Sequence, residues 1–371
     1  MMATDGASCS FDSWSDADEE AMANLVFDDD QDSDRERRQF DLECDRVLKN
    51  KGGPLQQRRH KYLIVSDLGR QHWCEQQLLY SLDPDVYLMR ALPGEVVNIE
   101  ESKEVKEIKS KGSDIHLTRE LEVHVPVEVK VVTKEDKWAV KLLNLQAAVV
   151  TFHTGGHIAR EVPVFGAPFD LGIFVFGIID ELRYDPEHHK VDILELKTRN
   201  SQYPPKQSQQ RKDQYQVSVY AQLFNELVLG KVSKEMVKKH LGLDLNKPLT
   251  ADVMEHVRAS NLGDKDRENT NLSSLLDTVL SQVQSLACIS QASLEYVHQE
   301  SKKQISLTDF DLDAESLEMS FSHHVKWWRG ERGTEGVDIE DCWKCSFCLF
   351  SELCEWREYM ANKTSKVSHN G

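Results

Sequence analysis

The chain has 371 residues, of which 40% are hydrophobic and 29% charged, and its formal net charge is −18. This length allows one large core, and no apolar run reaches the ~18 to 20 residues of a membrane span. An evenly spread negative charge would argue against a nucleic-acid partner. The charge is uneven, however, because residues 1–36 hold twelve acidic side chains and one arginine, which account for −11 of the −18.

The two ends of the chain are predicted to be disordered tails. Residues 1–58 begin with acidic runs at 16–20 and 28–30 and continue into a basic link at 49–51 and 58–61. Acidic segments of this kind stay solvated, and they can also dock a partner protein. They do not resemble a mitochondrial transit peptide, which is rich in arginine and poor in acids. Residues 361–371 are predicted to be a polar tail.

A charged segment at residues 98–112 lacks a core face and predicts a surface helix or a mobile loop. A short helical pattern follows at 117–122, directly after His116. Further along, residues 160–164 read as a strand that carries Glu161.

Residues 174–180 and 191–197 are predicted to pair as buried strands of a hairpin, joined by a turn at 185–190. The first strand ends in Asp180, and the second carries Glu195 and Lys197. Side chains two apart on a strand share a face, so Glu195 and Lys197 point the same way and Asp180 can reach them. Such a set suits a Mg²⁺ site for phosphodiester hydrolysis, with Mn²⁺ as an alternative. The carbonyl of Leu196 is a further candidate ligand. The other interpretation is an exposed hairpin with ordinary surface charges.

An amphipathic helix is predicted at residues 214–228, with Gln216 and Tyr220 four apart on one face. Three cations just before it are candidates for phosphate contacts: Lys206, Arg211 and Lys212. Residues 231–285 then read mostly as helices, and 292–297 as a strand. A helical insertion at 231–285 could roof the predicted site into a channel.

Trp327 and Trp328 lie in a stretch that mixes basic and aromatic residues. They could stack on the bases of a single strand or pack in the core. The core is favoured, because adjacent residues on a helix point in different directions.

Four of the eight cysteines crowd the C-terminal part: Cys342, Cys345, Cys348 and Cys354. Without a signal peptide, such crowding favours a metal over disulfides. These four could form a local zinc site. Alternatively, three of them could join a remote cysteine around a [4Fe–4S] cluster.

Together these motifs resemble the RecB-like branch of the PD-(D/E)XK nuclease superfamily. Glu195 and Lys197 take the places of the motif's acid and lysine, with Asp180 upstream. Gln216 and Tyr220 match the Gln-x-x-x-Tyr motif, and Gly112 with His116 matches a Gly-x-x-x-His motif whose histidine can bind metal. Glu161 is the weakest of these matches. With cysteines at both flanks, the pattern most resembles the eukaryotic exonuclease V family.

The resemblance implies an α/β nuclease domain over residues 59–360, with a central mixed sheet, a helical insertion and a C-terminal iron–sulfur lobe. It implies a [4Fe–4S] cluster held by Cys74, Cys345, Cys348 and Cys354. Cys342 is extra and leaves the zinc alternative open. His116, Asp180 and Glu195 are the implied Mg²⁺ ligands.

The implied activity is Mg²⁺-dependent hydrolysis of single-stranded DNA from free ends into short oligonucleotides, in DNA repair. The alternatives are an RNA or flap nuclease of the same fold and a zinc-bound, non-catalytic repair scaffold. A monomer is expected, and a single-strand-binding protein could be a partner. The expected location is the nucleus, with the cytoplasm or mitochondria as alternatives.

Overall fold

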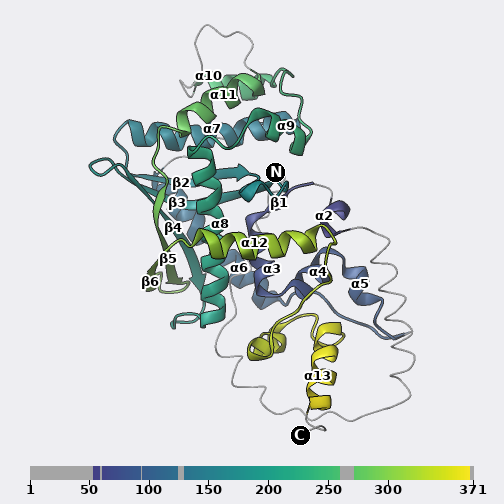
Figure 1. Cartoon of the computed structure of the whole chain (residues 1–371). Coiled ribbons are helices and arrows are strands. Elements are labelled where there is room, and N and C mark those ends of the chain that lie inside the picture. Colours follow the sequence, from purple (N-terminus) through teal and green to yellow (C-terminus); the bar gives the residue numbers. More distant parts are fainter. Residues whose placement is uncertain (1–52, 59–60, 93, 124–128, 260–270, 368–371) are drawn as a thin grey trace.

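The computed structural model describes residues 53–58, 61–92, 94–123, 129–259 and 271–367 (Figure 1). Most of the predicted acidic tail, residues 1–52, lies outside these ranges, as do residues 368–371 of the predicted polar tail. Helix α13 (Glu355–Val367) continues past Ala361, the predicted start of that tail.

A six-stranded mixed sheet forms the centre of the molecule, as predicted. Strands β3 and β4 are the predicted antiparallel hairpin, and β4 pairs in parallel with β5, which contains the predicted strand 292–297. The order along the sheet is β1-β3-β4-β5-β6, with β2 paired to β3. The strands are β1 (Leu63–Ile64), β2 (Ile158–Gly166), β3 (Val175–Asp185), β4 (Lys190–Arg199), β5 (Ile289–His298) and β6 (Gln304–Phe310).

The strands of the hairpin separate at the predicted catalytic acids. β3 pairs with β4 only from Glu181 onward, and β4 leaves β3 after Leu194 to continue along β5. On the same edge of β3, the short strand β1 pairs with Val175 and Phe176. Residues 177–180 therefore lie in a fork between β1 and β4, and Asp180 stands at its end.

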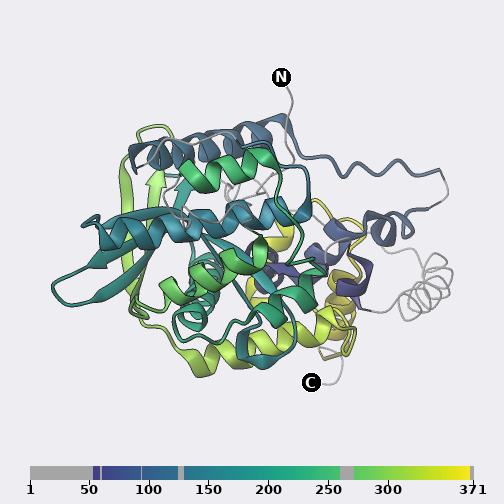
Figure 2. The same cartoon turned by 90° about the horizontal axis from the view of Figure 1, so that it is seen from above.

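Helices cover the sheet on both sides. Viewed from above, α6 lies along one side of the molecule and α12 along the other (Figure 2). Within the described residues, no helix combines the length and the apolar character that a membrane crossing requires. The helices are α2 (Pro54–Gln57), α3 (Val65–Trp73), α4 (Glu75–Leu82), α5 (Pro84–Leu88), α6 (Lys103–Val123), α7 (Lys134–His153), α8 (Gln207–Val228), α9 (Lys234–Leu241), α10 (Ala251–Ala259), α11 (Leu272–Val283), α12 (Ala314–Trp328) and α13, with the 3₁₀ segments η2 (Pro168–Asp170) and η3 (Ile339–Phe347).

Two helices differ from the prediction in extent. α6 is one continuous helix that includes both the charged segment 103–112 and His116. α8 begins at Gln207, so Arg211 and Lys212 lie within it and Lys206 is its N-cap.

The parts of the insertion 231–285 that the structure describes, residues 231–259 and 271–285, do not line the pocket around His116, Glu161 and Asp180. Helices α9 to α11 gather around α7 (Figure 1), because α11 buries its whole apolar face there and against α8. The residues of that face include Leu272, Leu276, Val279 and Val283, each at most 1% exposed. For these described helices the roof prediction is therefore wrong, and α6 is the helix that lies beside the site.

The two tryptophans of α12 pack in the core, which confirms the favoured prediction. Trp327 is 2% and Trp328 0% exposed. The indole N–H of Trp328 donates to the side-chain oxygen of Gln71 at 2.7 Å, so α12 is fixed to α3.

The first and last described parts of the chain lie side by side, with α3 to α5 next to η3 and α13 (Figure 1). The guanidinium of Arg332 donates two hydrogen bonds of 2.6 Å to Glu75, which is buried. Arg90 of the following segment donates to the carbonyl of Leu353 at 2.8 Å and to Glu358 at 2.9 Å. A bidentate Arg–carboxylate pair fixes orientation as well as distance, so these contacts define how the two ends meet.

Candidate active site and cysteine pocket

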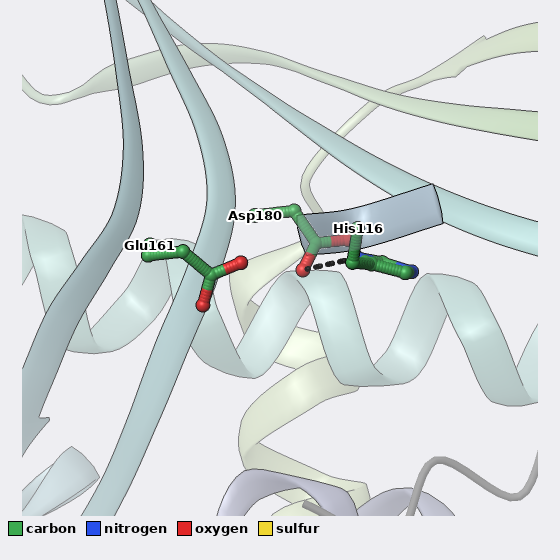
Figure 3. Close-up of side chains that lie close together, drawn as sticks. All are labelled: His116, Glu161 and Asp180. Atoms are coloured by element: carbon green, nitrogen blue, oxygen red, sulfur yellow. Dashed lines mark ion pairs between the residues drawn. The ribbon is translucent and has the colours of Figure 1, made fainter. Parts of the chain in front are cut away.

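Three side chains from three elements converge beside the fork: His116 of α6, Glu161 of β2 and Asp180 of β3 (Figure 3). One ligand atom from each lies within 4.8 Å of the others. The ring nitrogen Nδ1 of His116 is 3.7 Å from Oδ1 of Asp180. Two carboxylates and an imidazole at this spacing can hold a divalent cation.

Strand register explains why Glu161 faces Asp180. Arg160 pairs with Glu181 and Val162 with Ile179, so the residues between them stand opposite each other. Glu161 has a φ of 51°, a left-handed conformation that non-glycine residues seldom adopt. Like charges in opposite positions of a sheet are destabilising. Burial, followed by the charge of Asp180, raises the pKa of Glu161 to about 8.

A second group forms around Glu195, which is buried. Lys197 Nζ lies 3.2 Å from a Glu195 oxygen and donates to Gln216 Oε1 at 3.3 Å. The amide nitrogen of Gln216 donates to Glu195 at 3.3 Å and to the Tyr220 hydroxyl at 3.2 Å. The structure thus brings together the four predicted residues Glu195, Lys197, Gln216 and Tyr220.

Two observations connect the groups around Asp180 and Glu195. Asp180 accepts a hydrogen bond of 2.9 Å from the backbone N–H of Leu196, the residue between Glu195 and Lys197. Burial, followed by the charge of Asp180, raises the pKa of Glu195. Oxygen Oε2 of Glu195 is buried without a hydrogen-bond partner among the described residues. A buried carboxylate oxygen without a donor is costly, so this atom fits a cation or a water held by one.

Gly177 lets the supporting helix approach the sheet. A Cβ atom at this position would lie 2.5 Å from a ring carbon of Tyr220 and 2.7 Å from a methyl of Val65. A residue larger than glycine would therefore push α8 away from β3. Close packing against Tyr220 and Val65 therefore explains the glycine at the start of the Gly-Ile-Ile-Asp motif.

Among the metal-ligand predictions, His116 and Asp180 meet as expected, whereas Glu161 takes the third place in the group. The sequence signal for Glu161 was an acid on a strand at residues 160–164. Only the register between β2 and β3 shows that it lies opposite Asp180. Glu195 stands beside this group and is held by Lys197 and Gln216.

The raised carboxyl pKa values predict that the metal-free protein loses stability as pH rises. Such a group favours folding below its unfolded pKa, near 4.5, and this contribution is lost as pH rises through the folded pKa of about 8. A cation would offset the ionised carboxylates of Glu161 and Glu195. We therefore expect Mg²⁺ to raise the thermal midpoint, relative to EDTA, more at about pH 8 than at about pH 6.

Calorimetry at the two pH values checks this expectation. Glu161→Gln should reduce the difference between them, because one of the two titrating groups is removed. A Mg²⁺ effect that stays constant across this pH range in the unmodified protein would contradict the assignment.

Four cysteines line one pocket where the two chain ends meet: Cys74, Cys345, Cys348 and Cys354. Trp73, Phe350 and Trp356 also line it, and Cys342 is exposed and not part of the lining. Burial raises the pKa of Cys74 and of Cys348 to about 12. Thiols that bind a metal must lose their protons, so a metal here would reverse that shift.

The three predicted phosphate-binding cations lie in different surroundings. Lys206 Nζ stands 4.3 Å above the ring of Trp343, and Arg211 lies 3.5 Å from Asp341. Both contacts join the start of α8 to η3. Lys212 is buried and its Nζ is 3.4 Å from Asp213. Contact of these residues with DNA stays a prediction.

Comparison with known proteins addresses the family. A family model described as "Exonuclease V - a 5′ deoxyribonuclease" matches residues 53–192 and 185–357. Exonuclease V of Danio rerio is 36% identical over 311 residues, which cover 83% of this chain and 74% of that protein. The crystal structure of SSO0001 aligns with 86% of this chain and 95% of its own at 11% identity, and its TM-score of 0.37 is too low to bear on the fold.

The family model covers the elements that carry His116, Asp180 and Glu195 and extends to the last cysteine of the pocket. The relative covers most of the same region at well above 30% identity. The chain therefore belongs to the exonuclease V family of DNA exonucleases.

Proposed function

We propose that this chain is a divalent-metal-dependent exonuclease that degrades single-stranded DNA from a free 5′ end into short oligonucleotides. Its proposed role is DNA repair in the nucleus. The main support is the convergence of His116, Glu161 and Asp180 at a strand fork beside Glu195 and Lys197. The 5′ polarity follows the description of the family.

In this proposal His116, Glu161 and Asp180 hold the cation, with Glu195 beside them. A Mg²⁺ or Mn²⁺ ion would lower the pKa of a water and offset charge on the scissile phosphate. The protein's own groups do the rest. Lys197 supplies a fixed positive charge near the reacting phosphate, and Gln216 holds the Lys197 and Glu195 side chains in place through its amide. Hydrolysis adds water across one P–O bond of the backbone.

We further propose that the cysteine pocket holds a [4Fe–4S] cluster. The set that lines the pocket includes the remote Cys74 and omits Cys342, which fits three clustered cysteines plus one distant one better than a local zinc site of Cys342, Cys345, Cys348 and Cys354. The cluster would act as a structural clip and take no part in hydrolysis.

End-protected substrates test the proposed activity. Linear single-stranded DNA with a free 5′ end should be degraded when Mg²⁺ is present. A covalently closed circle of the same sequence should resist, and so should a linear strand whose 5′ end carries a bulky block. A strand blocked only at its 3′ end should be degraded. Equal loss of circle and linear strand would mean an endonuclease, and loss only from 3′ ends would contradict the polarity.

A further inference from the structure

Helix α7, which packs against β2, carries two lysines one turn apart, Lys137 and Lys141. Lys141 is half-buried, and its Nζ stands 3.9 Å above the ring of Phe176 and 6.0 Å from that of Trp138. Lys137 is exposed. Within the described part of the chain, neither lysine forms an ion pair with a carboxylate.

This arrangement costs free energy in the protein alone. Like charges four apart on a helix repel each other, and an ammonium group loses hydration when it is buried without a counter-charge. Burial, followed by the charge of Lys137, lowers the pKa of Lys141 to about 8. The cation–π contact with the ring of Phe176 offsets part of this cost. None of the acidic residues that the structure describes pairs with Lys141, so an anion from outside the described domain is the partner that fits.

The strand that carries Phe176, the ring under Lys141, also carries Asp180 of the metal-ligand group. Side chains alternate along β3, so Phe176, Ile178 and Asp180 lie on the same face. Ile178, between the other two, is 37% exposed although it lies in the sheet. At about 3.3 Å per residue, Phe176 and Asp180 are about 13 Å apart along the strand. A cation and an exposed apolar side chain thus lie in line with Asp180.

We propose that Lys141, with Lys137 beside it, binds a backbone phosphate of the DNA strand whose scissile phosphate lies at Asp180. Ile178 would contact the intervening nucleotide. Single-stranded nucleic acid offers both the anion and the apolar base faces that such a surface requires. The inference deepens the proposed function and rests on it.

Replacement of Lys141 by methionine keeps an unbranched apolar side chain that is one atom shorter and removes the charge. We expect Lys141→Met to raise the Kd for a fluorescent oligothymidylate roughly three- to tenfold, measured by anisotropy in EDTA so that no cleavage occurs. The slope of log Kd against log salt should fall by about 0.7, the value for one phosphate contact to a single strand. Lys141→Arg should keep most of the affinity and the slope. Lys326→Met, on the exposed face of α12, should change neither.

Thermal unfolding separates a binding role from a structural one. Lys141→Met removes a half-buried, unpaired charge, so its thermal midpoint should equal or exceed that of the unmodified protein. Weaker binding with a lower midpoint would mean a structural lysine and overturn the inference, as would an unchanged Kd and slope. Cleavage of the same oligonucleotide by the unmodified protein with Mg²⁺ is measured in parallel. Its absence would overturn the proposed function, whereas an unaffected Lys141→Met variant of an active enzyme would overturn this inference alone.

Discussion

Asp180→Asn is expected to lower the cleavage rate by about 10³-fold or more while single-stranded DNA still binds. Asparagine can still accept the hydrogen bond from the Leu196 N–H, so the fork between β3 and β4 keeps its geometry. The variant loses a charged ligand, however, and Glu161 loses its like-charged neighbour. The thermal midpoint in EDTA should therefore rise even as activity is lost. Single-turnover cleavage of a labelled strand, together with calorimetry, measures both effects.

The matched control is Asp192→Asn on the same strand as Glu195. Asp192 accepts a hydrogen bond of 2.8 Å from Ser290 at a position away from the metal-ligand group, and asparagine can keep that bond. Its cleavage rate should stay near that of the unmodified protein. Wild-type cleavage by Asp180→Asn would show that the active site has been placed on the wrong residues.

Cys74→Ser is expected to remove the proposed [4Fe–4S] cluster and destabilise the whole domain. Cys74 and Cys345 are 271 positions apart (345 − 74), and closing a loop of that length costs about 5 kcal/mol of chain entropy. A metal group bound by both cysteines would offset this entropy cost and raise the free energy of unfolding by up to that amount. Protein purified without oxygen should lose its visible absorbance, iron and labile sulfide in this variant, and its thermal midpoint should fall sharply.

Cys342→Ser tests the same assignment, because Cys342 is a ligand in the local zinc site but not in the proposed cluster. Cys342 is exposed and does not line the pocket, so this variant should keep its colour, its iron and its thermal midpoint. A protein that contains zinc instead of iron, and that loses the zinc in Cys342→Ser but keeps it in Cys74→Ser, would establish the local zinc site instead.

The sequence predicts side-chain neighbours correctly where the repeat of a single strand or helix determines which residues share a face. The alternation of a strand places Glu195 and Lys197 together, and the four-residue spacing of a helix places Gln216 with Tyr220. Both pairs lie in contact as predicted. The geometry of a helix likewise predicts the core position of Trp327 and Trp328, because adjacent residues point in different directions.

The remaining features depend on contacts between distant segments. Glu161 reaches Asp180 through the register of β2 on β3 and a left-handed backbone conformation, and neither is encoded in a local pattern. α6 buries only Gly112 and Ile115, so its sequence shows no core face and reads as charged surface. The insertion was misplaced because amphipathic helices show that they pack, but not on what.

The cysteine pocket has a consequence for how the protein is made. Cys74 lines the pocket from the N-terminal part of the domain. The other three cysteines of the pocket come from a segment that ends at Cys354, 280 residues later (354 − 74). At about 5 to 20 residues per second, a ribosome needs roughly 14 to 56 s to travel between them. In the later part of that interval, once Lys197 has been added, the nascent chain carries Asp180, Glu195 and Lys197, but the cysteines that would join Cys74 in the pocket are still missing. A ribosome that stalls after Tyr220 and before Cys345 would therefore leave a chain with all the hydrolytic residues but without the cysteines that complete the pocket.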